Sequence, residues 1–258
     1  MIASERTGKQ DSSGTGVHVM SNIALIMAAG RGQRTRQDIP KQFINVYDKP
    51  IIIYTLENFQ KHPDIDSIIV SCLDGWHDIL RAYAKQYGIE KLTDIVLGGN
   101  TVQESYRNGV FALKGKAEDN DIVVLHDGIR PMIDEDVLSD VIVTCRKYGN
   151  GVSSLPYNEQ IFRKKDEIST EEYINRDTLR RVQTPQAYRY GKLLWAYEKA
   201  FREEIGIYGP AYANTMMVDL GETLYFASGS ERNIKITTSE DIEIFKAFLS
   251  TKRDKWLK

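Results

Sequence analysis

The stretch ALIMAAGRGQRTRQDIPKQF, from Ala24 to Phe43, joins an apolar run to a cationic loop that contains two glycines. The run IALIM (23–27) is short and fully apolar, which is typical of a buried strand in a parallel sheet. Gly30 and Gly32 follow it at once, and glycines there let backbone N–H groups approach phosphate oxygens closely. The stretch predicts a strand that carries a loop to an anionic ligand.

The loop matches neither of two common phosphate-binding motifs. Thr35 occupies the third glycine position of the dinucleotide-binding fingerprint, and the loop contains no Gly-Lys-Ser/Thr of a Walker A motif. Its positive charges come from arginines, Arg34 among them, and from Lys41, whose backbone is restrained by Pro40. From this stretch alone, a solvent-exposed basic turn remains the alternative to a phosphate-binding loop.

Composition and charge exclude several classes of protein. The chain has 258 residues, 41% of them hydrophobic and 27% charged, which is ordinary globular usage. A net charge of -2 provides no global basic field, so we expect neither a nucleic-acid partner nor a membrane partner. Cys72 and Cys145 lie in apolar stretches without a CxxC, which favours free thiols and a cytoplasmic location over a zinc site. Residues 1–21 are mostly polar, and we expect a disordered tail there.

Short apolar runs alternate with helical patterns from residue 22 onward. Strands are expected at 23–27, 66–73, 94–99, 121–128, 151–156, 223–229 and 233–238, and helices at 49–62, 76–88, 101–115, 134–149, 192–204 and 240–250. Thr101 and Ser239 are the expected caps of two of these helices. The alternation predicts a three-layer, Rossmann-like α/β domain over 22–250, with a mostly parallel sheet and helices on both faces. Ligands in such folds bind beyond the carboxyl ends of the strands.

The segment HDGIRP supplies the next candidate residues. Asp127 follows an apolar strand, and a carboxylate there suits a Mg²⁺ ion that also binds substrate phosphates. Arg130 is placed for an anion, although a capping Asp with a surface Arg is the alternative. His126 is interpreted as structural, since an ionised phosphate nucleophile needs no general base. Lys235, in NIKITT, is a further candidate cation that could equally point into solvent.

The pattern changes after Pro156. Residues 157–181 are highly charged and alternate in places, which indicates an extended arm or hairpin outside the sheet. Long structureless loops are uncommon in compact domains, so pairing with a symmetry mate would satisfy the backbone of this arm. The sequence therefore predicts a homodimer built by a protruding arm at 157–181.

The motifs AAGxGxR…PKQF, GG…S, HDxxRP, TPQ and NIKIT occur in this order over residues 23–249. Together they resemble the 2-C-methyl-D-erythritol 4-phosphate cytidylyltransferases and, equally, their relatives the ribitol-5-phosphate cytidylyltransferases. The resemblance implies a glycosyltransferase-A-like nucleotidyltransferase that moves CMP from CTP to a polyol phosphate and releases pyrophosphate. A non-catalytic nucleotide-binding module is the remote alternative.

The resemblance also implies roles for particular residues. The residues expected to bind the nucleotide are Ala28, Ala29, Gly30, Gly32, Gly99 and Ser105. Those expected to stabilise charge during catalysis are Arg34, Lys41 and Lys235. Asp127 is the implied Mg²⁺ ligand, and Arg130 and the arm residue Arg176 are expected to hold the acceptor phosphate, with Arg176 reaching the partner subunit.

The chain departs from the family pattern at three places, and by resemblance the last two are regions that help to bind the acceptor. Val102 stands where the family usually has an arginine, PYNEQIF replaces an Asp-Thr pair, and YANTMMVDLG replaces an acidic Thr-Asp stretch. In the last of these, Asn214 or Asp219 is the candidate replacement. The acceptor therefore stays open among methylerythritol phosphate, for isoprenoid synthesis, and ribitol phosphate or another polyol or sugar phosphate, for surface polymers such as teichoic acid or capsule.

Overall fold

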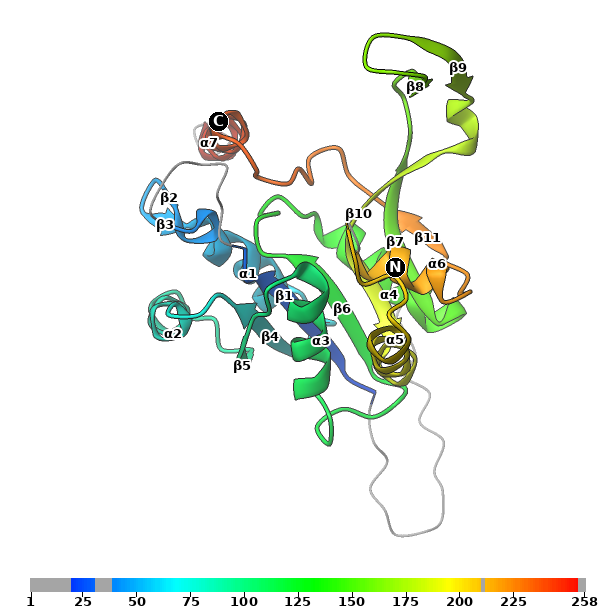
Figure 1. Cartoon of the computed structure of the whole chain (residues 1–258). Helices are drawn as coiled ribbons and strands as arrows, with labels where there is room; N and C mark the ends of the chain where they lie inside the picture. Colours follow the sequence, from blue (N-terminus) through cyan, green and yellow to red (C-terminus); the bar gives the residue numbers. More distant parts are fainter. Residues whose placement is uncertain (1–19, 31–38, 210–211, 255–258) are drawn as a thin grey trace, which may run out of the picture.

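A seven-stranded sheet runs through the centre of the protein (Figure 1). The computed structural model describes residues 20–30, 39–209 and 212–254. The sheet has the strand order β11-β7-β10-β6-β1-β4-β5. These strands are β1 (Asn22–Ala28), β4 (Ser67–Cys72), β5 (Leu92–Leu97), β6 (Ile122–Asp127), β7 (Asn150–Pro156), β10 (Arg180–Arg189) and β11 (Phe226–Ser228). All neighbouring pairs are parallel except those that β10 makes with β6 and β7.

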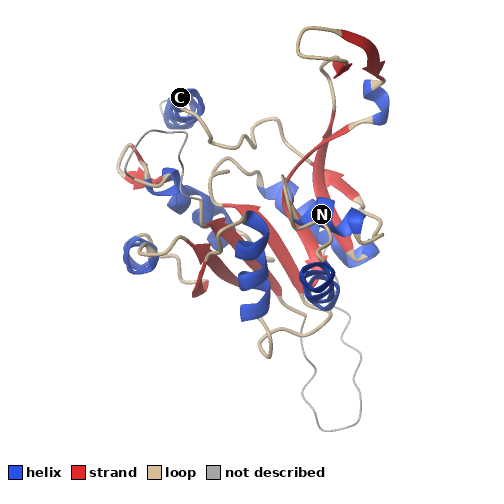
Figure 2. Ribbon diagram, in the orientation of Figure 1, coloured by secondary structure: helices blue, strands red, loops and turns tan. Residues whose placement is uncertain are grey.

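Helices cover both faces of the sheet, as the sequence predicts (Figure 2). They are α1 (Ile51–Lys61), α2 (His77–Gln86), α3 (Val102–Ala112), α4 (Glu135–Tyr148), α5 (Tyr190–Glu203), α6 (Ala213–Asp219) and α7 (Ser239–Asp254). Helices α1, α2 and α4 pack on one face, and α3, α5 and α6 pack on the other. Short elements complete the fold: β2 (Asn45–Val46), β3 (Lys49–Pro50), β8 (Ile161–Lys164), β9 (Thr170–Ile174) and the 3-10 turns η2 (Lys41–Phe43) and η3 (Arg176–Thr178).

The apolar character of β1 follows from its burial on both faces. Ala24 and Ile26 contribute to the core beneath α1, α2 and α4, whereas Ile23 and Leu25 contribute to the core beneath α3 and α5. Helix α3 approaches β1 so closely that a Cβ atom on Gly109 would lie 2.5 Å from Leu25 Cδ1. A strand with helices on both sides has no solvent-facing row, which explains the unbroken apolar run.

The sequence misses one strand of the central sheet and places another where none exists. Strand β10 inserts antiparallel between β6 and β7, and its buried side chains include the polar Gln183 and Gln186, which hide the strand from hydrophobic patterns. Conversely, residues 233–238 form no strand but an irregular segment, in which Ile236 N donates to Ile129 O at 2.9 Å. The prediction that Lys235 lies in a strand is therefore wrong.

Two terminal features also need correction. Helix α7 is capped by Thr238 rather than Ser239: Thr238 Oγ1 accepts from Asp241 N, and the Asp241 carboxylate accepts from Thr238 N at 2.8 Å. Met20 packs against the core, and Ser21 N donates to Asp121 Oδ1 at 2.8 Å, so these two residues do not belong to a tail. The other expected cap is confirmed, because Thr101 and Glu104 form a capping box at the start of α3.

The segment 157–181 contains a hairpin that projects away from the sheet (Figure 1). Its strands β8 and β9 pair antiparallel with each other, so the hairpin satisfies part of its own backbone. Arg180 and Arg181, at the end of the segment, belong to β10 and pair with β7. The hairpin and its turn expose large apolar side chains, with Phe162 58% exposed and Ile168 98% exposed.

The two cysteines are free and buried, as expected. Burial raises the pKa of both thiols to about 12, which leaves Cys72 and Cys145 protonated and unreactive near neutral pH. None of the described helices is long and apolar enough to cross a membrane.

Candidate active site

A cleft of about 490 Å³ opens at the carboxyl edge of the sheet, where β1 and β6 end. Most of the nucleotide-site and catalytic residues expected from the sequence line it. They are Ala28, Ala29, Gly30, Lys41, Gly99, Ser105, Asp127 and Lys235. Gly32 and Arg34 lie outside the described residues. These eight residues come from five separate segments of the chain.

Gln42 shapes the start of the glycine loop. Its side chain is 1% exposed, and Nε2 donates to Ala28 O at 2.8 Å and to Gly30 O at 3.0 Å. The adjacent Phe43 stacks on Trp76 with ring centroids 4.5 Å apart, which anchors the η2 turn. The PKQF segment therefore fixes the backbone at the end of β1 and places Lys41 beside it.

The paired glycines after β5 allow a close approach to β1. A Cβ atom on Gly98 would lie 2.3 Å from Ala29 Cβ, and one on Gly99 would lie 2.2 Å from Glu104 Cβ. Ser105 Oγ accepts from Gly99 N at 2.9 Å and donates to Thr101 O at 2.8 Å. The Ser105 hydroxyl thus stabilises the conformation of the loop after β5. Its hydrogen bonds are made to the backbone of this protein, not to a ligand.

Asp127 lies at the floor of the cleft between two cations. Its Oδ2 atom is 3.0 Å from Arg130 Nε and 3.1 Å from Lys235 Nζ. Burial alone would raise the pKa of Asp127, but the positive charges of Lys235 and Arg130 outweigh it and lower the pKa from 3.8 to about 2. The carboxylate is therefore ionised at any physiological pH.

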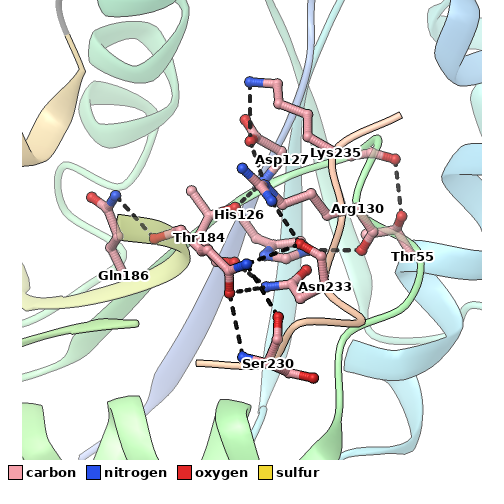
Figure 3. A network of polar contacts seen from close by, with 11 residues as sticks. Thr55, His126, Asp127, Arg130, Thr184, Gln186, Ser230, Asn233 and Lys235 are labelled. Atoms are coloured by element: carbon pink, nitrogen blue, oxygen red, sulfur yellow. Dashed lines mark hydrogen bonds and ion pairs between the residues drawn. The ribbon is translucent and has the colours of Figure 1, made fainter. Parts of the chain in front are cut away.

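The segments HDGIRP, TPQ and NIKIT form one polar network around Asp127 (Figure 3). Arg130 Nη1 donates to Asn233 O at 2.7 Å, and Asn233 Nδ2 donates to Thr184 O at 2.7 Å. Thr184 Oγ1 in turn accepts from Asp127 N at 3.1 Å. Since Asn233 is fully buried, the network fixes Arg130 and carries the backbone of Lys235 over the cleft.

Arg130 and Arg176 do not line the cleft. Arg130 points inward to Asp127 and Asn233, and its side chain is 14% exposed. Arg176 lies in η3 beside the hairpin, where Nη1 donates to Asn158 O at 2.7 Å. Within a single chain, the structure therefore does not bring Arg176 to the other expected site residues.

His126 is confirmed as a structural residue. It is fully buried against Phe59, and burial lowers its pKa to about 4, so the ring is neutral near pH 7. Nε2 lies 3.1 Å from Arg130 O, and because a carbonyl can only accept, this nitrogen carries the proton. The ring thus supports the turn that carries Arg130.

Several residues that line the cleft were not expected from the sequence to do so. They are Met27, Gln42, Asn100, Thr101, Val102, Ile129 and Tyr212. Asn100, Thr101 and Val102 follow the paired glycines directly, so their position after a strand was an available signal. Tyr212 begins the stretch YANTMMVDLG, whose departure from the family pattern was a signal, and it reaches the cleft through the connection between α5 and α6. Asn214 and Asp219, the candidate replacements for an acidic stretch, lie in α6 and do not line the cleft.

Asp127 is the only carboxylate among the described residues that line the cleft. No group of three or more histidine, cysteine or acidic side chains that could hold a metal occurs in the described parts of the chain. A metal bound here would therefore take one protein carboxylate and complete its shell with water and ligand oxygens, which is the usual coordination of Mg²⁺ at phosphates.

A parallel α/β sheet that gathers a glycine loop, lysines and one ionised carboxylate at its carboxyl edge defines a nucleotidyltransferase. The 2-C-methyl-D-erythritol 4-phosphate cytidylyltransferase (IspD) family model matches residues 22–251, and the chain belongs to this family. Ribitol-5-phosphate cytidylyltransferase of Lacticaseibacillus paracasei is 56% identical over 229 residues, which cover 89% of this chain and 98% of that protein.

Two further relatives agree with this assignment. 2-C-methyl-D-erythritol 4-phosphate cytidylyltransferase of Clostridium tetani is 38% identical over 230 residues, covering 88% of this chain and 90% of that protein. The crystal structure of 4-diphosphocytidyl-2C-methyl-D-erythritol synthase from Anaerococcus prevotii superposes with a TM-score of 0.77 at 26% identity, over 90% of this chain and 99% of that one.

Because the loop after β5 lies so close to the end of β1, adding one methyl group to this loop should lower the stability of the protein. Gly98→Ala places a Cβ against Ala29 and 3.1 Å from Cys72 O, so we expect a loss of roughly 1–3 kcal/mol in the free energy of unfolding. Urea denaturation measures this loss. Gly30→Ala is the matched control, because its Cβ would meet no described atom within 4 Å. Equal stability of the two variants would contradict the argument.

The ion pairs of Asp127 predict a pH-dependent stability. Because its folded pKa of about 2 lies below the value of 3.8 for a free carboxyl, the ionised form stabilises the fold above pH 3.8, and this contribution is lost as the pH falls toward 2. We expect Asp127→Asn to be less stable than wild type by on the order of 2 kcal/mol at pH 7. Unfolding curves at pH 7, 4 and 3 should show the difference narrowing, whereas a constant difference would refute the assignment.

Proposed function

We propose that this protein transfers CMP from CTP to D-ribitol 5-phosphate, releasing pyrophosphate and forming CDP-ribitol. The observation that carries the proposal is the 56% identity, over nearly the full length, to the ribitol-5-phosphate cytidylyltransferase of Lacticaseibacillus paracasei. Identity to the methylerythritol phosphate enzyme of Clostridium tetani is lower, at 38%. The stretch YANTMMVDLG, which replaces the acidic stretch of the family and begins with the cleft residue Tyr212, is consistent with an acceptor other than methylerythritol phosphate.

In the proposed reaction, an oxygen of the acceptor phosphate attacks the α-phosphorus of CTP and pyrophosphate leaves. The acceptor phosphate is already ionised near neutral pH, so no general base is required, which agrees with the neutral, buried His126. The task of the protein is to hold two polyanions together and to stabilise the charge of the transition state. We assign this role to Lys41, Lys235 and Arg34.

We propose Mg²⁺ as the cofactor, with Asp127 as its protein ligand. The fit rests on the ionised state of Asp127 and on its position in a cleft that otherwise presents lysines and backbone groups. When bound, the ion would neutralise phosphate charge and polarise the reacting phosphoryl group. Arg130, held by both Asp127 and Asn233, keeps the carboxylate in place. We also propose a cytoplasmic location, which the two free, buried cysteines fit.

The proposed function is tested with a panel of substrates. The protein is incubated with Mg²⁺, one of CTP, UTP or ATP, and one of ribitol 5-phosphate, methylerythritol 4-phosphate or other polyol and sugar phosphates. We expect CDP-ribitol by mass spectrometry and pyrophosphate release only with CTP. Equal turnover with UTP or ATP would contradict cytosine specificity, and a preference for methylerythritol phosphate would reassign the acceptor.

Lys41→Ala tests the proposed charge stabilisation. We expect kcat to fall by roughly 10² or more, because a preorganised cation acts mainly on the transition state, while CTP binding weakens less. The melting temperature should remain close to that of wild type, since one cleft lysine contributes little to stability. Lys61→Ala, at an exposed position at the end of α1, is the control and should leave kcat unchanged. Wild-type kcat in Lys41→Ala would exclude this role.

We further propose a homodimer formed through segment 157–181, in which Arg176 reaches the acceptor site of the partner subunit. The support is the projecting hairpin, whose Phe162 and Tyr173 are 58% and 68% exposed, because exposed apolar clusters mark interaction surfaces. Because β8 and β9 pair with each other, an unsatisfied backbone is no longer the argument for a partner subunit. The exposed side chains of Phe162 and Tyr173 are now that argument.

Light scattering tests the dimer. We expect a dimer at micromolar concentration for wild type and a monomer with lost activity for Phe162→Glu/Tyr173→Glu, since each introduced carboxylate would be buried in the interface. Arg176→Ala is the comparison variant: it should remain a dimer but show a raised KM for the polyol phosphate. A fully active monomeric wild type would refute both parts of the proposal.

A further inference from the structure

Gln103 is a buried polar residue to which the proposed reaction gives no role. It lies in the first turn of α3 with 1% of its surface exposed, directly after Val102, which lines the cleft. Nε2 donates to Gly206 O at 2.9 Å and to Tyr212 O at 3.2 Å, and Oε1 accepts from the hydroxyl of the fully buried Tyr197 at 3.1 Å. The amide of Gln103 therefore uses both its donor hydrogens and its acceptor oxygen inside the protein.

These bonds fasten both ends of the connection between α5 and α6. Gly206 lies just after α5 and Tyr212 just before α6, so a single side chain holds the two ends against α3. Gly206 has a φ of +63°, and a Cβ atom there would lie 2.8 Å from Met216 Cα, so this end has little room to rearrange. The location of Tyr212 relative to α3 thus depends on Gln103.

The Tyr212 side chain forms a partition beside the cleft. It lines the main cleft together with Val102 and Lys235, and its ring centroid lies 5.9 Å from Lys235 Nζ. The same tyrosine lines a second hollow of about 170 Å³, which Val102 and Tyr208 also border. Displacement of Tyr212 would join the two hollows and widen the cleft, so its position sets the shape of the site.

The topology indicates which substrate this partition faces. Backbone from β1 and the loop after β5 forms the side of the cleft assigned to the nucleotide, whereas Tyr212 follows α5, which itself follows β10 beyond β6 in the sheet. Lys235, assigned to the phosphates, lies beside the tyrosine. An aromatic ring with a hydroxyl suits the mixed C–H and hydroxyl surface of a polyol chain.

We propose that Tyr212 contacts the polyol phosphate acceptor and restricts its size, and that Gln103 is a positioning residue that holds Tyr212 in place. The inference rests on the proposed function, because it assigns an acceptor to the side of the cleft that Tyr212 borders. In this proposal the first turn of α3 contributes to both substrate sites. The turn follows the paired glycines after β5, on the side assigned to the nucleotide, and through Gln103 it holds Tyr212 on the side assigned to the acceptor.

Steady-state kinetics of three variants and one control test this inference. Gln103→Leu removes both donors, Tyr212→Ala removes the ring, and the double variant removes both. We expect each single variant to raise the KM for ribitol 5-phosphate about tenfold, which is typical of the loss of one pocket contact. The KM for CTP should stay within about twofold of the wild-type value. Because Gln103 acts through Tyr212, the double variant should be no worse than Tyr212→Ala alone.

Tyr197→Phe is the matched control for stability. It removes one buried hydrogen bond from Gln103 Oε1 but keeps both bonds to the backbone carbonyls, so its melting temperature should fall while both KM values stay at wild type. If Gln103→Leu fails to fold, Tyr212→Ala still decides the contact, since that side chain is 45% exposed.

The outcomes separate this inference from the proposed function. Absence of turnover of any polyol phosphate by wild type would refute the function itself. Turnover with a wild-type acceptor KM in Tyr212→Ala would overturn the contact, and additive effects in the double variant would overturn the positioning role of Gln103. A rise in the KM for CTP alone would assign Tyr212 to the nucleotide instead.

Discussion

The salt bridges of Asp127 with Arg130 and Lys235 are the constraint on which the rest of the site depends. A carboxylate at the end of a buried strand is costly unless it is paired, and here two cations hold it ionised. The two cations differ in freedom. Arg130 is also bound to Asn233 O, whereas Lys235 extends over the cleft with 33% of its side chain exposed. Arg130 therefore maintains the carboxylate, and Lys235 is the cation that can turn toward a phosphate.

Buried polar contacts connect these salt bridges to the strands of the sheet. Asn233 connects Arg130 to Thr184, and Thr184 accepts from the backbone of Asp127, so β6, β10 and the segment before α7 are fixed relative to one another (Figure 3). Such networks specify one geometry because each unmet partner would be costly in a low-dielectric interior. The position of Lys235 thus follows from polar contacts, since its segment belongs to no strand.

The part of this arrangement that the sequence predicts is the part governed by local patterns. Strands such as β1, buried on both faces, produce apolar runs that identify the sheet, and residues such as Asp127 stand out because they follow those runs. Strand β10 was not predicted because it buries the polar side chains of Gln183 and Gln186. Gln183 donates to Ser230 O, 47 residues later in the chain, and Gln186 accepts from the nearby Tyr188 hydroxyl. The stretch that begins with Tyr212 stood out from the family pattern, but the position of this tyrosine could not be predicted, because it depends on the contact with Gln103, more than a hundred residues earlier.

The two sides of the cleft are built from different kinds of structure, and this bears on how one fold can serve different acceptors. The side assigned to the nucleotide consists of strand ends and backbone, where Gly98 and Gln42 leave little freedom. The other side is formed by connections outside the sheet, including the one that ends at Tyr212. Substitutions in such connections change the shape of the site without disturbing the core. The departure from the family pattern around α6 lies on this side, where a change of acceptor would carry the least structural cost.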